Sequence, residues 1–185
     1  DPRLSKSGFI SCNSCHNLST GGSDNLKTSI GHNWQKGPIN SPTVLNSVLS
    51  VAQFWDGRAA TLEDQAKGPP ANPIEMGMAN LDAVIDRVKH IPGYKPYFEK
   101  AFGAGDVVTM DNAAKAIAAY ERTLITPNSA YDLYAKGDLK ALTERLDGVR
   151  DKLFEVDGRR VAPDDVGLAV ADGIGVVEDD PLFEA

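Results

Sequence analysis

The sequence feature that most constrains the fold of this chain is Cys12-Asn13-Ser14-Cys15-His16, a C-x-x-C-H motif. This pattern is the covalent attachment site of a c-type haem. Two thiols three positions apart can add to the two vinyl groups of one haem, and the adjacent histidine can then bind the iron as its proximal ligand. A chain with this motif is expected to fold around the porphyrin, because the porphyrin supplies a large apolar surface for packing.

The cysteine pair has two other interpretations, a redox dithiol and half of a zinc site. Cys12 and Cys15 are the only cysteines among the 185 residues, whereas a structural zinc site built on cysteine usually needs four ligands. A thioredoxin-like dithiol expects a strand before it, but residues 4–10 are predicted to form a short helix. The pattern therefore favours haem c.

The charge is distributed unevenly along the chain. Residues 1–142 hold 14 acidic and 14 basic residues, whereas residues 143–185 hold 12 acidic and 5 basic residues and account for the net charge of −7. This balance argues against nucleic acid as a partner. No apolar run reaches the roughly 18 residues that a membrane span needs. We therefore treat residues 1–142 as one domain and residues 143–185 as an acidic C-terminal segment, a solvated surface being the simplest interpretation of its charge.

The fold class predicted is mainly α, a cytochrome c-like haem domain with long haem-wrapping loops and a short divergent C-terminal segment. Residues 17–80 carry repeated Gly, Pro, Asn and Ser turn signals and little apolar periodicity, so they are expected to be mostly loop. Short helices are predicted over residues 42–50 and over residues 61–66, the latter capped by Thr61. Longer periodic patterns predict a helix that begins after an Asn80 cap and stops before Pro92, and further helices over residues 95–102, over residues 112–125 after an Asp111 cap, and over residues 130–136.

The end of the chain has a different pattern. Residues 143–155 are predicted to form an amphipathic helix, and Asp157-Gly158 is a two-residue hairpin signal between residues 154–156 and 159–161. Residues 164–185 show a weak helical pattern followed by an acidic end.

A haem held by His16 needs a second axial ligand or an open position. His32 is the best candidate because it lies in a Gly-rich loop after the attachment motif, and imidazole suits iron. Met76 and Met78 lie in a Pro/Gly segment that could fold over the haem. His90 is expected at the surface. Met110, before a helix start, is expected to be a packing residue.

Two further side chains are candidates for the haem pocket. Trp55 is either a core residue or an electron route at the porphyrin edge. Glu75 follows Asn72-Pro73 in an otherwise apolar segment. A carboxylate near a haem iron can act as a proton shuttle for cleavage of the O–O bond. The alternative for Glu75 is a surface salt bridge.

Taken together, six segments strongly resemble the bacterial dihaem cytochrome c peroxidases, the group that includes MauG-like relatives. The similarity covers about residues 4–142, in order and at family-like spacing. The segments are residues 12–16, 29–32, 37–46, 52–58, 62–65 and 72–76.

The resemblance implies that this region is the N-terminal domain that holds the peroxidatic, low-potential haem. His16 would be the proximal ligand, and His32 the distal ligand of a resting bis-histidine iron, on a loop that swings away after reductive activation. Gln65 and Glu75 match residues that line the opened peroxide site, with Glu75 as the acid–base group. Trp55 matches the tryptophan between the two haems.

The same resemblance implies a cofactor, partners and a compartment. Asn40 matches a ligand of an interdomain calcium ion whose other protein ligands come from the second domain. The substrate would be hydrogen peroxide, and the electron donor a small protein, a cytochrome c or a cupredoxin. Haem c attachment implies an exported, oxidising compartment, and we expect the periplasm.

The chain also departs from the family pattern. After Leu142 the family continues with a helix and a second C-x-x-C-H, but no cysteine follows Cys15 here. The second haem domain is therefore expected to be lost, trimmed or supplied by another chain, and a homodimer is a further alternative. With a single haem, the second oxidising equivalent would have to reside on the porphyrin or Trp55, or be met by an external donor. If His32 stays on the iron, the chain would instead be a bis-histidine electron-transfer cytochrome.

Overall fold

The computed structural model describes residues 1–138, 140–141, 155–156 and 159–160. The chain divides into two compact units, Asp1–Thr126 and Pro127–Ala185. The predicted domain boundary after residue 142 stays a prediction, because residues 142–154 lie outside the described part.

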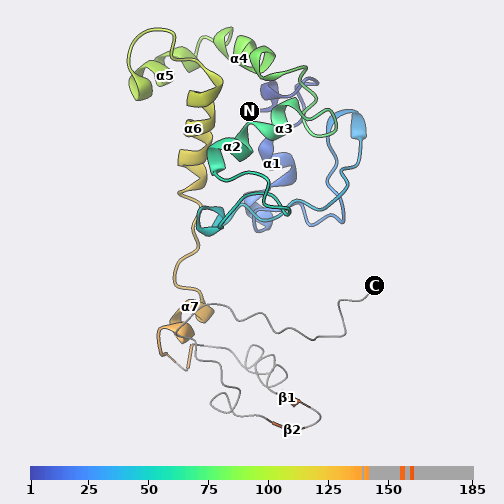
Figure 1. Ribbon diagram of the computed structural model, residues 1–185, viewed down its shortest axis with the longest axis vertical. Coiled ribbons are helices and arrows are strands. Elements are labelled where there is room, and N and C mark those ends of the chain that lie inside the picture. The colour runs from blue at the N-terminus through green and yellow to red at the C-terminus, as the bar shows by residue number, and fades with distance from the viewer. Residues whose placement is uncertain (139, 142–154, 157–158, 161–185) are drawn as a thin grey trace. The chain divides into compact units, whose positions relative to one another are not determined.

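The first unit is helical, as predicted, and its helices are short in the first half and longer in the second (Figure 1). Between them, residues 17–61 form loops broken only by single 3-10 turns, and the described part of the unit holds only the isolated bridges Ile30 to Lys36 and Gln53 to Ala59. The helices are α1 (Cys12–Cys15), α2 (Leu62–Ala66), α3 (Gly68–Ala71), α4 (Leu81–Lys89), α5 (Tyr94–Phe102) and α6 (Met110–Glu121). The 3-10 turns are Pro2–Leu4, Leu18–Thr20, His32–Trp34 and Ser47–Leu49.

Local capping explains most of the helix starts. The side chains of Thr61 and Asn80 accept hydrogen bonds from backbone N–H groups in the first turns of α2 and α4, which confirms both predicted caps. The predicted cap of α6 is wrong: Thr109 caps this helix, and its backbone is extended as a cap requires. Asp111 already lies inside the first turn, where its carboxylate pairs with Lys67 Nζ at 2.8 Å. The helix also ends at Glu121, before the predicted residue 125.

Two predicted helices are largely wrong. Over residues 4–10 the chain makes turns, because Ser5 Oγ donates to Pro2 O at 2.8 Å and accepts from Ile10 N at 3.2 Å. Such side-chain bonds compete with helical hydrogen bonding. Over residues 42–50 only Ser47–Leu49 forms a turn, since Asn46 adopts a left-handed backbone with a φ of 61°.

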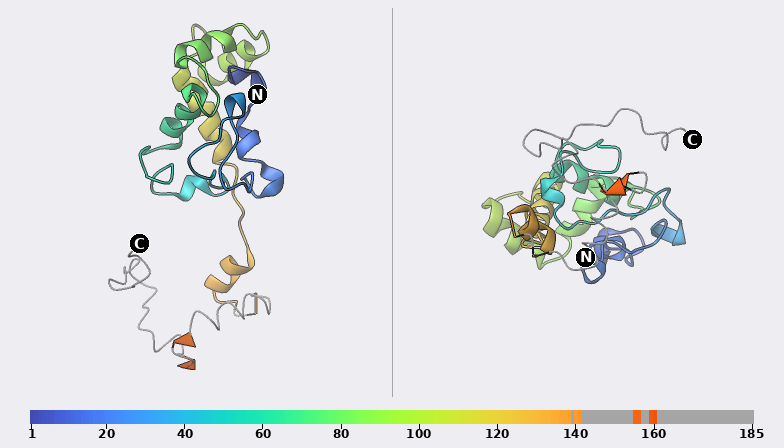
Figure 2. Two further views of the ribbon diagram at one scale, coloured as in Figure 1. Left: turned by 90° about the vertical axis from the view of Figure 1, so that its right-hand side faces the viewer. Right: turned by 90° about the horizontal axis from the view of Figure 1, so that it is seen from below.

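The core lies where α4, α5 and α6 meet, with Ile85, Val88, Phe98 and Val108 as its buried cluster. Met110 packs against this cluster, consistent with its expected packing role. Helix α6 also packs along α2, and the two helices lie side by side in Figure 1 and in the left view of Figure 2. No helix in the described ranges is long and apolar enough to cross a bilayer.

Two loops of the first unit cross at very close range. The backbone N–H of His32 donates to the carbonyl oxygens of Ile74 and Glu75, both at 2.8 Å. A Cβ at Gly31 would overlap the Ile74 carbonyl oxygen, and a Cβ at Gly77 would lie 2.5 Å from His32 Cδ2. The crossing therefore depends on glycine in both loops.

In the second unit, α7 (Ala130–Ala135) begins after Ser129, which exchanges hydrogen bonds with Asp132 in a capping box. Strands β1 (Glu155–Val156) and β2 (Arg159–Arg160) pair antiparallel, with Val156 opposite Arg159, which confirms the predicted hairpin. Three predicted features lie outside the described residues. They are the turn at residues 157–158, the helix predicted over residues 143–155 as far as residue 154, and the weak helical pattern over residues 164–185.

The packing of α6 generates a first prediction. Ala118 is 0% exposed, whereas its neighbour Ala119 is exposed. We expect Ala118→Leu to lower the free energy of unfolding by about 1–3 kcal/mol, because overpacking strains a filled interior. Ala119→Leu is the matched control and should change it by less than about 0.5 kcal/mol. Urea unfolding of both variants measures the difference, and equal effects would contradict the packing described for α6.

The loop crossing generates a second prediction. Gly77 and Gly57 have similar left-handed backbones, with φ of 72° and 68°, but a Cβ at Gly57 would meet only Ala52 Cβ at 3.6 Å. Each substitution to alanine should cost about 1–2 kcal/mol from backbone strain alone. Gly77→Ala should cost clearly more, because its methyl group meets the His32 ring. Thermal unfolding compares the two, and a smaller loss for Gly77→Ala would show that the loops do not cross this closely.

Candidate active site

A large cavity of about 1220 Å³ lies inside the first unit. Its wall is built by α1, the loops over residues 37–43 and 53–58, the segment from α2 to Met76, and one face of α6. It exceeds the roughly 300–1,000 Å³ of ordinary ligand pockets, so a porphyrin is a fitting occupant. The wall brings together most of the predicted site residues, namely Cys12, Cys15, His16, Asn40, Trp55, Gln65, Glu75 and Met76. His32 does not line it.

The two thiols of the motif lie on one turn of helix, α1, and both are unpaired. Burial raises the pKa of the Cys15 thiol and of the Cys12 thiol. Although Cys12 has a large exposed surface, it lines the cavity, where protein atoms surround it on several sides.

His16 is held in a definite orientation. Its Nδ1 lies 3.0 Å from the carbonyl oxygen of Pro42. Because that oxygen can only accept, Nδ1 carries the proton of the neutral ring and Nε2 keeps its lone pair. Ser41 Oγ donates to Cys15 O at 2.7 Å and ties the same loop to the motif. A histidine oriented by a backbone carbonyl is the usual arrangement of a metal ligand.

These donors fit a covalently bound haem. The two thiols, the free Nε2 of His16 and the cavity wall all come from adjacent parts of the first unit. Cys12 and Cys15 would hold the porphyrin, and His16 would bind its iron.

His32 is buried, with 8% of its surface exposed, and packs against Gly77 instead of the cavity. Its Nδ1 is buried without a hydrogen-bond partner among the described residues. Its role as the distal iron ligand stays a prediction. His90, by contrast, is exposed at the end of α4, as expected.

Glu75 is a half-buried carboxyl group on the cavity wall. Its Oε1 accepts a hydrogen bond of 2.8 Å from Asn72 Nδ2. Burial raises the pKa of Glu75, and the positive charge of Arg58 partly opposes this effect. Glu75 makes no ion pair with any described residue, so its alternative as a salt-bridge partner has no support there.

The remaining predicted residues lie on the same wall. Gln65 reaches it from α2, and Trp55, which is 60% exposed, donates its Nε1–H to Asn40 O at 3.0 Å. Within the described residues, no group of three or more His, Cys, Asp or Glu side chains could hold a metal ion. The calcium role of Asn40 therefore stays a prediction.

Three wall residues were missed by the sequence reasoning. Arg58 lies 3.5 Å from the centroid of the Phe54 ring and pairs with Asp56 at 2.8 Å. Glu121 is half-buried, and burial raises its pKa. Its signal was its spacing, four positions after Ile117 on the cavity face of α6. Asn72 is the partner of Glu75, and an Asn-Pro pair before an acidic residue signals such a turn.

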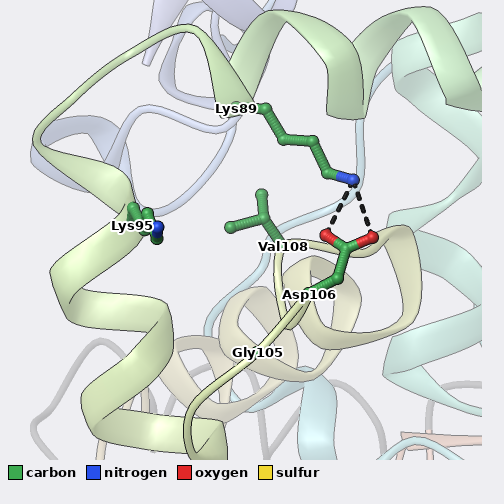
Figure 3. A pocket seen from close by; sticks show the side chains of 5 residues that line it. All are labelled: Lys89, Lys95, Gly105, Asp106 and Val108. Atoms are coloured by element: carbon green, nitrogen blue, oxygen red, sulfur yellow. Dashed lines mark hydrogen bonds and ion pairs between the residues drawn. The ribbon is translucent and has the colours of Figure 1, made fainter.

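A second hollow of about 350 Å³ lies near the core, between α4, α5 and the loop before α6 (Figure 3). Lys89 and Asp106 pair with each other across its rim at 2.8 Å. Its charged groups thus have partners, and we assign no chemistry to it.

Comparison with known proteins agrees with this geometry. The family model described as di-haem cytochrome c peroxidase matches residues 1–140. The cytochrome c551 peroxidase of Nitrosomonas europaea is 58% identical over 85% of this chain and 46% of its own length. That of Pseudomonas aeruginosa is also 58% identical, over 77% of this chain and 41% of its own length.

More distant relatives carry the MauG name. The methylamine utilization protein MauG of Methylorubrum extorquens is 42% identical over 77% of this chain and 40% of its own length. A solved MauG-like protein associated with microbial copper homeostasis aligns with a TM-score of 0.72 and 32% identity, over 83% of this chain and 45% of that chain. The chain spans less than half the length of these relatives. By the match over residues 1–140 and these identities, the chain belongs to the di-haem cytochrome c peroxidase family.

Proposed function

We propose that this chain is the haem c-binding part of a peroxidase that reduces hydrogen peroxide to water with electrons from a small redox protein. The observation that carries the proposal is the shared cavity: Cys12, Cys15 and His16 line it together with the carboxyl group of Glu75. A haem bound there supplies a redox-active iron to which peroxide can bind.

The protein side chains supply positioning and proton transfer. His16 would bind the iron through Nε2, the nitrogen that the bond to Pro42 leaves free. Glu75 is the acid–base group: it takes a proton from one peroxide oxygen and returns it to the other, so that the leaving oxygen departs as water. Burial moves its pKa up from the ordinary carboxyl value, toward the pH at which an acid–base group works best. Gln65 lies on the same wall and is proposed to orient the peroxide.

Each peroxide consumes two electrons and two protons to give two water molecules. Trp55, exposed at the cavity wall, is the proposed route by which electrons enter. The donor is proposed to be a cytochrome c or a cupredoxin, in the periplasm, where haem c is attached. Because the chain spans less than half of its relatives, a second haem domain or chain is proposed to supply the second electron. Calcium at Asn40 would belong to that junction.

The competing function is a bis-histidine electron carrier, which requires His32 to occupy the iron in both redox states. His32 packs against Gly77 outside the cavity wall, which supports an accessible iron. Visible spectra of the oxidised and dithionite-reduced protein, before and after addition of carbon monoxide, separate the two functions. A shift on adding carbon monoxide supports the peroxidase. Sharp c-type bands that do not shift would support the electron carrier. A spectrum without haem bands would contradict both functions.

The proton-transfer role generates a third prediction. Glu75→Gln keeps the shape of the side chain but removes its acid–base function, so we expect the rate constant for reaction with hydrogen peroxide to fall by about 10²–10⁴-fold. Stopped-flow mixing of the reduced haem protein with peroxide measures it.

Glu121→Gln is the matched comparison, because it neutralises the other half-buried carboxyl of the wall. We expect it to have the smaller effect. A large loss with Glu121→Gln and none with Glu75→Gln would show that Glu121, and not Glu75, transfers the proton.

A further inference from the structure

We propose that Asn72 is the positioning residue that fixes the carboxyl group of Glu75 in the cavity. The role of Asn72 in the reaction rests on the proposed function of Glu75. The hydrogen bond between Asn72 and Glu75 does not depend on that function and can be tested separately.

One side chain holds Glu75 at two points. Asn72 Nδ2 donates to Glu75 Oε1 at 2.8 Å. Asn72 Oδ1 accepts from the backbone N–H of Ile74 at 2.9 Å and, more weakly, from that of Glu75 at 3.4 Å. The amide therefore connects the backbone of the Glu75 segment to the carboxyl group at the end of the Glu75 side chain.

These bonds also determine which way the amide faces. Two backbone N–H donors point at one end of the Asn72 amide, so this end must be the oxygen. The NH₂ group must then face Glu75 and can only donate to it. With Oε1 occupied, Glu75 Oε2 makes no hydrogen bond to any described residue and is the oxygen left for the substrate.

Asn72 is itself held in place at the end of α3. Its backbone N–H donates to Pro69 O at 3.2 Å, and its carbonyl oxygen accepts from Gly77 N at 2.8 Å. An anchor that is fixed on both sides transmits little motion to the group it holds. The positive charge of Arg58 also acts on Glu75. Arg58 already forms an ion pair with Asp56, and its guanidinium group stacks on the Phe54 ring. It is therefore a poor substitute for Asn72.

The substitution Asn72→Asp separates the two roles of the amide. It keeps an oxygen for the backbone N–H groups, so the turn should form, but it replaces the donor to Glu75 with a second carboxylate oxygen. We expect the unfolding temperature of the haem-loaded protein to fall by about 2–8 °C, as for the loss of one good hydrogen bond.

The same substitution should behave differently when Glu75→Gln is also present. The amide introduced by E75Q can donate to the carboxylate introduced by N72D, which restores a hydrogen bond with its direction reversed. N72D should then lower the unfolding temperature by much less than it does alone, and a double-mutant cycle measures this coupling. Asn80→Asp is the matched control, because Asp caps a helix as well as Asn does and Asn80 lies outside the cavity.

Kinetics tests the positioning role. N72D alone should slow the reaction of the reduced haem with hydrogen peroxide by about 10–100-fold, because a misplaced catalytic group loses that much. The rate of haem reduction by dithionite should not change, and N72D should cause no further loss in protein that already carries E75Q. A merely structural role of Asn72 would not depend on the residue at position 75.

The outcomes distinguish the two proposals. If N72D lowers the unfolding temperature and the rate constant for reaction with peroxide by the same amounts with and without E75Q, Asn72 does not position Glu75. If the stability coupling is present but E75Q alone leaves the peroxide reaction unchanged, the hydrogen bond is supported and the proposed catalytic role of Glu75 is wrong. If N72D is as fast as the unmodified protein while E75Q is slow, Glu75 acts without the help of Asn72.

Discussion

The hydrogen bond between His16 Nδ1 and the carbonyl oxygen of Pro42 is the contact on which the site depends. It fixes the ring so that Nε2 stays free. The bond from Ser41 Oγ to Cys15 O holds the same loop on the attachment helix. The long loops of this unit offer few helical hydrogen bonds of their own, so such single contacts position them. The loop over residues 37–43 is thereby placed against the motif and forms its part of the cavity wall.

Local features of the structure were predictable from local sequence. Thr61 and Asn80 cap their helices through bonds to residues three positions away, and the apolar spacing of α4 was visible in the sequence. The α6 cap was missed because Thr109 and Asp111 are both good cap residues. The ion pair of Asp111 with Lys67, far along the chain, was not visible in the sequence. Ser5 shows the same limit, since its bond to Ile10 competes with a helix that its neighbours would permit.

Only part of the candidate site was predictable from the sequence. The attachment motif was recognisable because its residue types and spacing carry its chemistry, whereas the expected role of Glu75 came from the family resemblance. The burial of His32 against Gly77 could not be predicted, since it follows from a contact between two distant loops. Glu121 shares the wall with Glu75, and burial raises the pKa of both carboxyls. The two differ in that Glu75 accepts a hydrogen bond from Asn72. Burial alone therefore does not single out the acid–base group.

The backbone of His32 connects two loops of the candidate site. Its backbone N–H donates to Ile74 O and Glu75 O, so the histidine loop is bonded directly to the loop that carries Glu75. On the other side of the segment, Asn72 holds the carboxyl group of Glu75. A displacement of the His32 backbone would therefore remove two hydrogen bonds from the Glu75 segment and draw the His32 ring away from Gly77. The position of the His32 loop and the order of the Glu75 segment thus depend on one set of contacts.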